Sequence, residues 1–213
     1  MRIYLKQLEL GPLQNFVYLI GPAESAETAV VDPGWDVPGI LKTAERDGRR
    51  ITAVLVTHTH FDHINGVAEL VSATDVPVYV HKKEEGALPV EPASRKGVEG
   101  GYEFSLGPLA LSFLHTPGHT PGSLCVSVQD KLITGDTLFI GGCGRCDLPG
   151  GDPELLHKSL VRLSQMDDRF IVHPGHNYAS QPTSFLKDEK RYNPFLQAKD
   201  LLGFMGLIGA VRK

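Results

Sequence analysis

The stretch Thr57-His58-Thr59-His60-Phe61-Asp62-His63 follows directly on the apolar run Ile51-Thr52-Ala53-Val54-Leu55-Val56. In that run both the odd- and the even-numbered positions are largely apolar, which is typical of a strand buried on both faces. Three imidazoles and a carboxylate therefore stand where a rigid strand ends. While the backbone stays extended, His58, His60 and Asp62 share one side, and His63 lies on the other side unless the loop turns. This arrangement predicts a site for two adjacent metal ions.

Three further segments repeat the pattern of a short apolar run that ends in His or Asp. The runs are Leu109 to Leu114, Leu132-Ile133 and Phe170 to Val172, and they lead into Thr116-Pro117-Gly118-His119, Gly135-Asp136-Thr137 and Pro174-Gly175-His176. Proline and glycine favour tight turns at these points. We expect four strand ends to converge on one sheet edge of a layered α/β scaffold. The candidate ligands are His58, His60, Asp62, His63, His119, Asp136 and His176.

The chemistry of these ligands indicates which metals they suit. Nitrogen and oxygen ligands without a thiolate favour zinc, iron or manganese over a cysteine-rich structural zinc site. Asp136 stands alone between the two histidine groups, and its two oxygens can bridge ions roughly 3.5 to 4 Å apart. Seven ligands around two ions leave room for solvent, which disfavours a binding module without catalysis. We expect the other histidines to be structural and not ligands; an orienting role for His115 or His173 stays open. These four are His81, His115, His157 and His173.

The motifs together resemble the metallo-β-lactamase superfamily, and specifically its glyoxalase II-like branch. The resemblance runs from the first strands to about Gln197 and implies a four-layer αββα sandwich with metals between the sheet edges. It also implies the ligand sets: His58, His60 and His119 for one ion, Asp62, His63 and His176 for the other, and Asp136 shared. We expect residues 1–213 to form one domain.

A metal pair implies a hydrolytic mechanism. A water between two divalent ions becomes a hydroxide near neutral pH, and one ion polarises the substrate carbonyl. Asp62 and Asp136 are the expected catalytic carboxylates, with Asp62 orienting the bridging hydroxide. Such a site cleaves an ester, thioester or lactam without an amino-acid nucleophile.

The resemblance implies a glutathione thioester, such as S-lactoylglutathione, as the substrate. Arg145, in Gly142-Cys143-Gly144-Arg145, occupies the basic position of the family's glutathione-contacting loop, and Tyr178 matches another family contact. A surface salt bridge is the alternative role for Arg145. Asp147 stands where the family has an aromatic residue, and the chain ends soon after Asn193-Pro194-Phe195, without the additional helical region of full-length glyoxalase II.

Two alternatives stay open. The motifs also resemble those of persulfide dioxygenases, which carry a sequence close to Gly142 through Asp147. In that family a single Fe(II) is held by residues corresponding to His58, His119 and Asp136. The second alternative is a lactonase or another ester hydrolase of this fold. The segment Glu189 to Leu196 resembles the short hydrolases, which favours hydrolysis. His60 stands where flavin-linked diiron carriers have a carboxylate, which disfavours that class.

Composition supports a small-molecule enzyme. The 213 residues carry a net charge of -4 with 41% hydrophobic residues, and no basic run suggests nucleic acid. No apolar stretch is long enough to cross a bilayer, and Met1 to Lys6 begins in a strand-like pattern, so we expect a cytoplasmic protein. The sequence does not indicate the oligomeric state.

The three cysteines do not form a disulfide framework. Cys125 is expected in the core, and Cys143 and Cys146 fit a redox pair poorly without a thioredoxin-like context.

Local patterns predict the remaining elements. A strand is expected over Thr28 to Val31, and helices over Val37 to Asp47, over Gly66 to Ala73 with Asn65 as cap, and after the cap Asp152. Residues 88–101 are rich in Pro, Gly and charge and predict a surface loop, either a connection or a lid. The apolar tail Leu201 to Ile208 is expected to cover the core.

Overall fold

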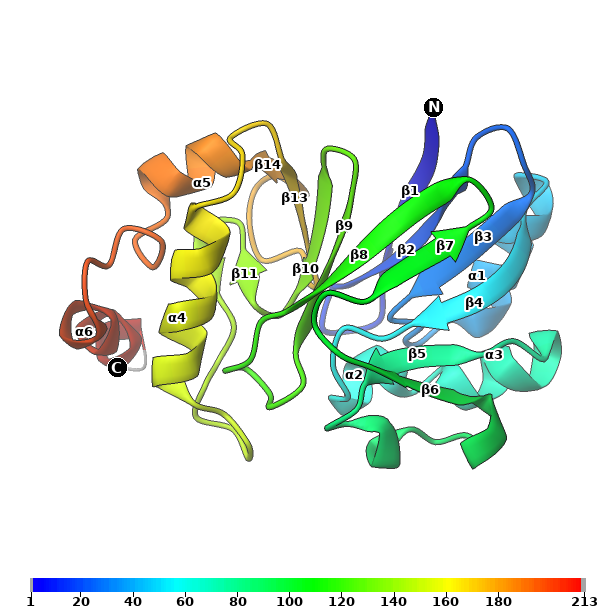
Figure 1. The fold of residues 1–213 in the computed structure, drawn as a ribbon, viewed down its shortest axis with the longest axis horizontal. Coiled ribbons are helices and arrows are strands. Elements are labelled where there is room, and N and C mark those ends of the chain that lie inside the picture. Colours follow the sequence, from blue (N-terminus) through cyan, green and yellow to red (C-terminus); the bar gives the residue numbers. More distant parts are fainter. Residues whose placement is uncertain (1, 212–213) are drawn as a thin grey trace.

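Two six-stranded mixed sheets form the centre of the computed structural model, which describes residues 2–211 (Figure 1). The first sheet has the order β1-β2-β3-β4-β5-β6, and the second has the order β14-β13-β10-β9-β8-β7. The strands of the first sheet are β1 (Ile3–Leu10), β2 (Asn15–Pro22), β3 (Glu27–Val31), β4 (Arg50–Leu55), β5 (Val78–His81) and β6 (Arg95–Val98). Those of the second are β7 (Glu103–Leu106), β8 (Leu109–His115), β9 (Leu124–Val128), β10 (Lys131–Gly135), β13 (Ile171–Pro174) and β14 (Ser184–Phe185). A short hairpin pairs β11 (Leu138–Phe139) with β12 (Gly142–Cys143).

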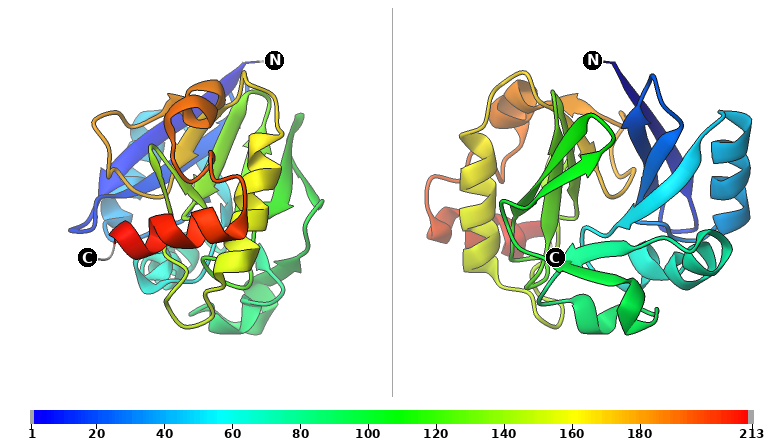
Figure 2. Two further views of the ribbon diagram at one scale, coloured as in Figure 1. Left: turned by 90° about the vertical axis from the view of Figure 1, so that its left-hand side faces the viewer. Right: turned by 45° about the vertical axis from the view of Figure 1, so that its right-hand side comes forward.

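Helices cover the outer face of each sheet, so the layers run α, β, β, α (Figures 1 and 2). Helices α1 and α3 pack on the first sheet, and α4 and α6 pack on the second. The helices are α1 (Val37–Arg46), α2 (Phe61–Ile64), α3 (Val67–Thr74), α4 (Pro153–Ser164), α5 (Leu186–Tyr192) and α6 (Leu201–Val211), with short 3-10 turns at Glu85–Ala87 and Pro92–Ser94. The expected four-layer αββα sandwich is therefore confirmed.

Strand β2 shows why the sequence builds three cores. All of its residues are buried, and its side chains alternate between the two faces of the sheet. Tyr18 and Ile20 pack between the sheets, whereas Val17 and Leu19 pack against α1 and α3. A third core lies between the second sheet and α4, α5 and α6, and it includes Cys125 as expected. A strand such as β2 is apolar on both faces because helices cover one side of the sheet and the second sheet covers the other.

Most of the predicted helix boundaries agree with the structure. Asp36 caps α1 by accepting from the backbone N of Gly39 (3.0 Å), and Asp152 caps α4 by accepting from that of Leu155 (2.9 Å). The prediction for Asn65 was wrong: Gly66 is the N-cap of α3. The side chain of Asn65 instead accepts a 2.6 Å hydrogen bond from the backbone N of Trp35. Asn65 is the C-cap of α2, and this hydrogen bond joins it to the segment before α1.

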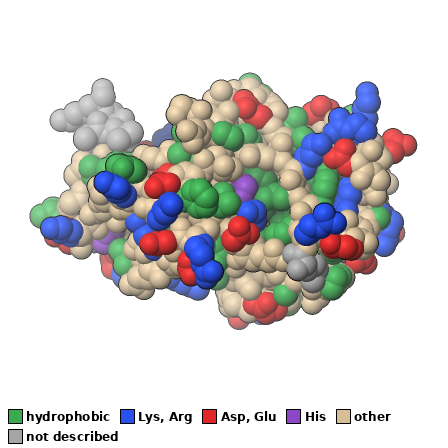
Figure 3. All heavy atoms as spheres, turned by 90° about the horizontal axis from the view of Figure 1, so that it is seen from above, with side chains coloured by type: hydrophobic (Ala, Val, Ile, Leu, Met, Phe, Trp, Pro, Cys, Tyr) green, Lys and Arg blue, Asp and Glu red, His purple; other side chains and the backbone are tan. Residues whose placement is uncertain are grey.

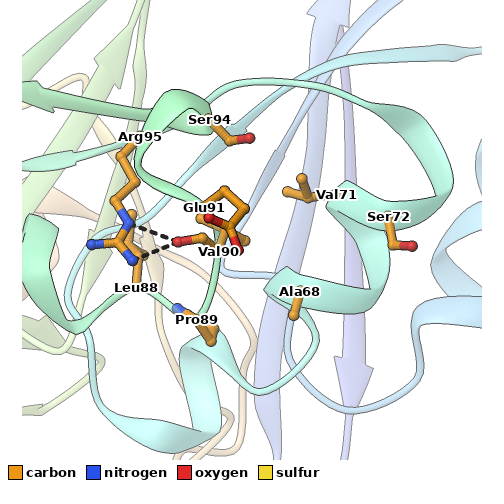
Figure 4. A pocket seen from close by; sticks show the side chains of 9 residues that line it. All are labelled: Ala68, Val71, Ser72, Leu88, Pro89, Val90, Glu91, Ser94 and Arg95. Carbon is orange, nitrogen blue, oxygen red and sulfur yellow. Dashed lines mark hydrogen bonds between the residues drawn. The ribbon is translucent and has the colours of Figure 1, made fainter.

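The prediction of a surface loop over residues 88–101 was wrong in part. Residues 95–98 form β6, which pairs in parallel with β5, and Leu88 is buried against α3. Arg95 donates to the carbonyl of Val90 at 2.8 Å (Figure 4). This segment and α3 line an open pocket of about 410 Å³ that none of the candidate ligands lines. The pairing of residues 95–98 within the first sheet favours a connection over a lid.

The apolar tail behaves as expected. Phe204 and Ile208 of α6 are buried in the third core. Within residues 2–211, no helix has both the length and the apolar character that a bilayer crossing requires. On the face shown in Figure 3, acidic and basic side chains are interspersed, without a continuous basic surface.

Candidate metal centre

The candidate ligands meet where the ends of the two sheets face each other. The segment after β4 carries four of them, the β8–β9 loop carries His119, and the ends of β10 and β13 carry Asp136 and His176. Backbone hydrogen bonds join the two sheets at this point: Leu124 N donates to Thr57 O (2.8 Å), and Phe16 N donates to Gly175 O (2.8 Å). The strand ends are thereby held in one place, as the sequence predicted.

Three groups of side chains in the described residues offer metal-ligand atoms that lie within 4.8 Å of one another, and one of them joins Asp32 to His58 and His63. We call His58, His60 and His119 the first cluster, and Asp62, His63 and His176 the second cluster. Helix α2 begins at Phe61, so the backbone leaves the extended conformation after His60. This turn brings Asp62 and His63 to the same ion position, which an extended strand would not do.

Asp136 lies between the clusters. Its Oδ2 is 3.5 Å from Nε2 of His119 and 3.3 Å from Nε2 of His176, and its Oδ1 is 3.4 Å from Nε2 of His63. Oδ1 is buried and has no hydrogen-bond partner. A Cβ at Gly175 would lie 2.3 Å from this oxygen, so only glycine leaves room for the carboxylate. Asp136 thus has the position that a ligand shared by both clusters needs.

Hydrogen bonds to the outer nitrogens fix the orientation of the rings. Nδ1 of His119 donates to Arg145 O (2.7 Å), Nδ1 of His176 donates to Leu13 O (2.9 Å), and Nδ1 of His63 lies 3.1 Å from Asp32 Oδ2. For His58 the partner is the hydroxyl of Thr57 at 3.1 Å. With Nδ1 protonated, each Nε2 points inward with a free electron pair, which is the form in which histidine binds a metal.

The inward nitrogens approach one another closely. The distance between Nε2 of His63 and Nε2 of His176 is 3.1 Å, and that between Nε2 of His58 and Nε2 of His119 is 3.2 Å. Two electron pairs at this distance repel unless a cation lies near them. Together with the unpartnered Oδ1 of Asp136, this geometry fits the binding of metal ions by these residues.

Charge at the site points the same way. Burial lowers the pKa of His63, but the carboxylates of Asp136, Asp32 and Asp62 outweigh it and raise the pKa to about 9. Burial raises the pKa of Asp136, but His63, His176 and neighbouring histidines outweigh it and hold the pKa well below its usual range. Burial also holds the pKa of His58 well below its usual range. The carboxylates therefore stay ionised and favour a positive charge beside His63, where a bound metal ion would take the place of the proton on that ring.

The two predicted substrate contacts lie in different surroundings. The ring of Tyr178 stacks on that of His176, with centroids 4.7 Å apart and planes 10° apart, and it contacts Phe139 edge to face. The guanidinium of Arg145 forms two hydrogen bonds with Asp147, at 3.0 and 3.1 Å. Tyr178 is thus adjacent to a candidate ligand, whereas the Arg145 side chain has the surface salt bridge that was its alternative role.

The four remaining histidines belong to neither cluster in the described part of the chain. His115 stacks on His81 with ring centroids 4.1 Å apart, His157 lies on α4, and His173 packs edge to face against Tyr18. His115 and His173 do not orient a ligand, since neither ring nitrogen of His173 has a hydrogen-bond partner and His115 bonds to Pro121 O. The orienting groups are backbone carbonyls, Thr57 and Asp32 instead.

Sequence reasoning missed Asp32 and Asn15 as parts of the site. Asp32 accepts hydrogen bonds from the backbone N (2.7 Å) and hydroxyl (2.6 Å) of Thr57, besides facing His63. Asn15 donates to Oδ2 of Asp62 (2.8 Å) and accepts from the indole of Trp35 (2.8 Å). Asp32 follows the apolar run Thr28 to Val31, the same signal that marked the other ligands. Asn15 had no such signal, because it begins its strand.

The chain belongs to the metallo-β-lactamase superfamily: the sequence profile described as "Metallo-beta-lactamase superfamily" matches residues 10–176. It is similar to a hydroxyacylglutathione hydrolase of Anaeromyxobacter dehalogenans, with 38% identity over 80% of this chain and 64% of that relative. The alignment thus spans somewhat less than two thirds of this relative's length.

Two solved structures are similar to the whole sandwich. The crystal structure of ETHE1 from Myxococcus xanthus superposes with a TM-score of 0.89 at 29% identity, over 99% of this chain and 92% of that one. The structure of TTHA1623 in a di-iron-bound form superposes with a TM-score of 0.79 at 36% identity, over 89% of this chain and 99% of that one. These likenesses agree with the glyoxalase II-like and persulfide dioxygenase-related branch that the motifs indicated.

Proposed function

We propose that this protein is a metal-dependent hydrolase that cleaves a glutathione thioester such as S-lactoylglutathione. In this proposal the first cluster holds one divalent ion, the second cluster holds another, and Asp136 is shared. The observation that carries the proposal is the convergence of the Nε2 atoms of His58, His119, His63 and His176 around an unpartnered oxygen of Asp136. The di-iron form of TTHA1623 supports a pair of ions; zinc or manganese are the other candidates.

The metal pair supplies, when bound, an activated water and an electrophile for the substrate carbonyl. The side chains have separate tasks around it. Asn15 donates to Oδ2 of Asp62, which lies 3.4 Å from Nε2 of both His63 and His176, and so fixes the carboxylate beside the second cluster, where it can accept a proton from an attacking water. Partial burial and the carboxylates of Asp136 and Asp62 raise the pKa of Tyr178 to about 12. Its hydroxyl therefore keeps its proton and can donate to the substrate.

The substrate class rests on two features. The hydroxyacylglutathione hydrolase similarity supports a glutathione thioester. Arg145 is the cation that can bind a glutathione carboxylate, provided that it exchanges Asp147 for the substrate. We infer that the substrate is a small molecule in the cytoplasm. A lactone or another ester is the alternative substrate for hydrolysis.

A persulfide dioxygenase is the second candidate, and the similarity to ETHE1 favours it together with the sequence Gly142 through Asp147. In that case a single Fe(II) is held by His58, His119 and Asp136. The second cluster then has no metal to bind, although Asn15 and Asp32 hold its side chains in position.

One experiment separates these functions. The protein is produced with iron and zinc available, purified without oxygen or chelator, and the metals per chain are determined by elemental analysis for the wild type and for His176→Ala. Thiol release from S-lactoylglutathione and oxygen consumption with glutathione persulfide are measured on the same samples. For the wild type we expect close to two metals per chain and thiol release. In His176→Ala we expect the loss of one metal and of most of the thiol-releasing activity. A single iron that His176→Ala retains, with oxygen consumption, would reject hydrolysis in favour of persulfide oxidation.

A further inference from the structure

Glu84 is a buried carboxylate near the first cluster, with 6% of its surface exposed. Its Oε2 accepts hydrogen bonds from the backbone N (2.7 Å) and the hydroxyl (3.0 Å) of Thr59. Its Oε1 accepts from the backbone N of Gly122 (2.8 Å) and from the hydroxyl of Thr120. Four donors around one carboxylate offset the cost of burying its charge, and they fix its position.

The donors belong to the two segments that carry the first cluster. Thr59 lies between His58 and His60, and Thr120 follows His119. One carboxylate thus connects a segment at the end of the first sheet with a loop of the second sheet. The distance between these segments sets how far Nε2 of His119 lies from the two histidines on the other side.

The surroundings of Glu84 leave it little freedom. The hydroxyl of Thr120 also bonds Ser123 Oγ (2.8 Å), which in turn accepts from the backbone N of Thr120 (3.0 Å). A Cβ at Gly122 would lie 2.8 Å from Cγ of Glu84 and 2.9 Å from its Oε1. Glycine at 122 is therefore required for the carboxylate to reach both segments.

We propose that Glu84 is a positioning residue that sets the geometry of the first metal site and leaves the second site to other groups. The second cluster is oriented by Asp32, Asn15 and the carbonyl of Leu13, which do not contact Glu84. The proposal rests on the proposed function, since that function assigns one ion to each cluster. Loss of one partner of an outer hydrogen bond typically lowers metal affinity about 10- to 100-fold.

Glu84→Gln is the variant that tests this role with the smallest change in shape. A glutamine has one acceptor oxygen, so its amide group must face either Thr59 N or Gly122 N, both of which are donors. We therefore expect one of the two segments to lose its anchor. Glu45→Gln, on the exposed side of α1, is the control with the same change in charge.

The test measures metal affinity in two variants that each keep one ion site. The metal-free protein is titrated with Zn²⁺, and the heat of binding is recorded by calorimetry. In His176→Ala the remaining ion is that of the first cluster, and in His60→Ala it is that of the second. We expect Glu84→Gln to lower the affinity for the remaining ion about 10-fold or more in the His176→Ala background, and less than 3-fold in the His60→Ala background. An equal effect in both backgrounds, or none in either, would overturn the proposal.

Gly122→Ala gives an independent test that keeps the carboxylate. The added methyl displaces Glu84 from Gly122 N, so this variant is expected to show the same preference for the His176→Ala background. If Glu84→Gln does not fold, Gly122→Ala decides alone by the same comparison. A wild type that binds fewer than two ions would reject the proposed function itself, which is a different result from equal effects in the two backgrounds.

Discussion

Nε2 of His63 and Nε2 of His176 lie 3.1 Å apart, although Nδ1 of each ring already has an acceptor on its outer side. The two inward electron pairs face each other across the second cluster. The protein has therefore built a position that favours a cation before any cation is bound, and binding there should stabilise the folded state.

The first prediction is that metal stabilises the fold measurably. A ligand present at 1,000 times its dissociation constant adds about 4 kcal/mol to the free energy of unfolding. We expect the melting temperature to rise with free Zn²⁺ and to fall when a chelator is added. Thermal unfolding followed by circular dichroism checks this. A melting temperature that is the same with chelator and with Zn²⁺ would contradict metal binding by the clusters.

The second prediction concerns Asp32, which holds both Thr57 and His63. The hydroxyl of Thr57 and Nδ1 of His63 both face Oδ2 of Asp32, whereas the backbone N of Thr57 donates to Oδ1. Asp32→Asn leaves one acceptor oxygen, so either the backbone of Thr57 loses its bond, or the hydroxyl of Thr57 and His63 lose theirs together. We expect metal affinity and turnover each to fall about 10- to 100-fold. Equilibrium dialysis against Zn²⁺ measures the affinity. Asp75→Asn, on the surface at the end of α3, is the matched control and should bind metal as the wild type does.

The ligands were predictable from the sequence because each one ends an apolar run that is long enough to be read as a strand. His119, Asp136 and His176 are far apart in the chain, but strand ends of a layered sheet meet at one edge. The same logic failed for Asn65, because the sequence does not show that α2 ends there and turns the side chain toward Trp35. It failed for residues 95–98 as well, since parallel pairing with β5 depends on distant residues rather than on local pattern.

The groups that orient the ligands were less predictable than the ligands. Two of them are backbone carbonyls, those of Leu13 and Arg145, which any residue type can supply. Glu84 follows a strand but in a run of charged residues, where a solvated role is the ordinary expectation. Only the fold shows that four donors surround its carboxylate.

The third prediction concerns substrate binding by Arg145, which forms a salt bridge with Asp147. Arg145→Ala should raise KM for S-lactoylglutathione about 10-fold with little change in kcat, because it removes a charge-assisted contact that is the same before and during reaction. Asp147→Asn should lower KM, since it releases the guanidinium for the substrate carboxylate. Steady-state kinetics of thiol release measures both.

A neutral thioester of N-acetylcysteamine serves as the control substrate for these variants. It carries no carboxylate, so its KM should not change in Arg145→Ala or Asp147→Asn. Equal increases in KM for both thioesters in Arg145→Ala would show that Arg145 acts on the loop rather than on the substrate.

The fourth prediction is that α6 is part of the core. Phe204 is fully buried and packs against Phe195 and His157. Phe204→Ala should lower the free energy of unfolding by about 3 to 5 kcal/mol, as for other large buried aromatic residues. Urea unfolding measures it, with Leu202→Ala, on the exposed side of the same helix, as the control. A change below about 1 kcal/mol for Phe204→Ala would contradict this packing.

The last prediction concerns His173, whose ring is buried against Tyr18 without a hydrogen-bond partner for either nitrogen. Burial and the nearby Lys131 lower the pKa of His173 to about 4, against an ordinary value of 6.5. Between these values the unfolded chain binds a proton that the folded protein does not, so stability must fall as the pH falls from 6.5 to 4. The shift corresponds to about 3 kcal/mol in all, at about 1.4 kcal/mol per pH unit. In His173→Phe this contribution should vanish. Urea unfolding of both proteins with chelator present, at intervals from pH 7 to 4, measures the difference, since the chelator removes the contribution of bound metal from both. Parallel curves for the wild type and His173→Phe would show that His173 is not the group that destabilises the fold in acid.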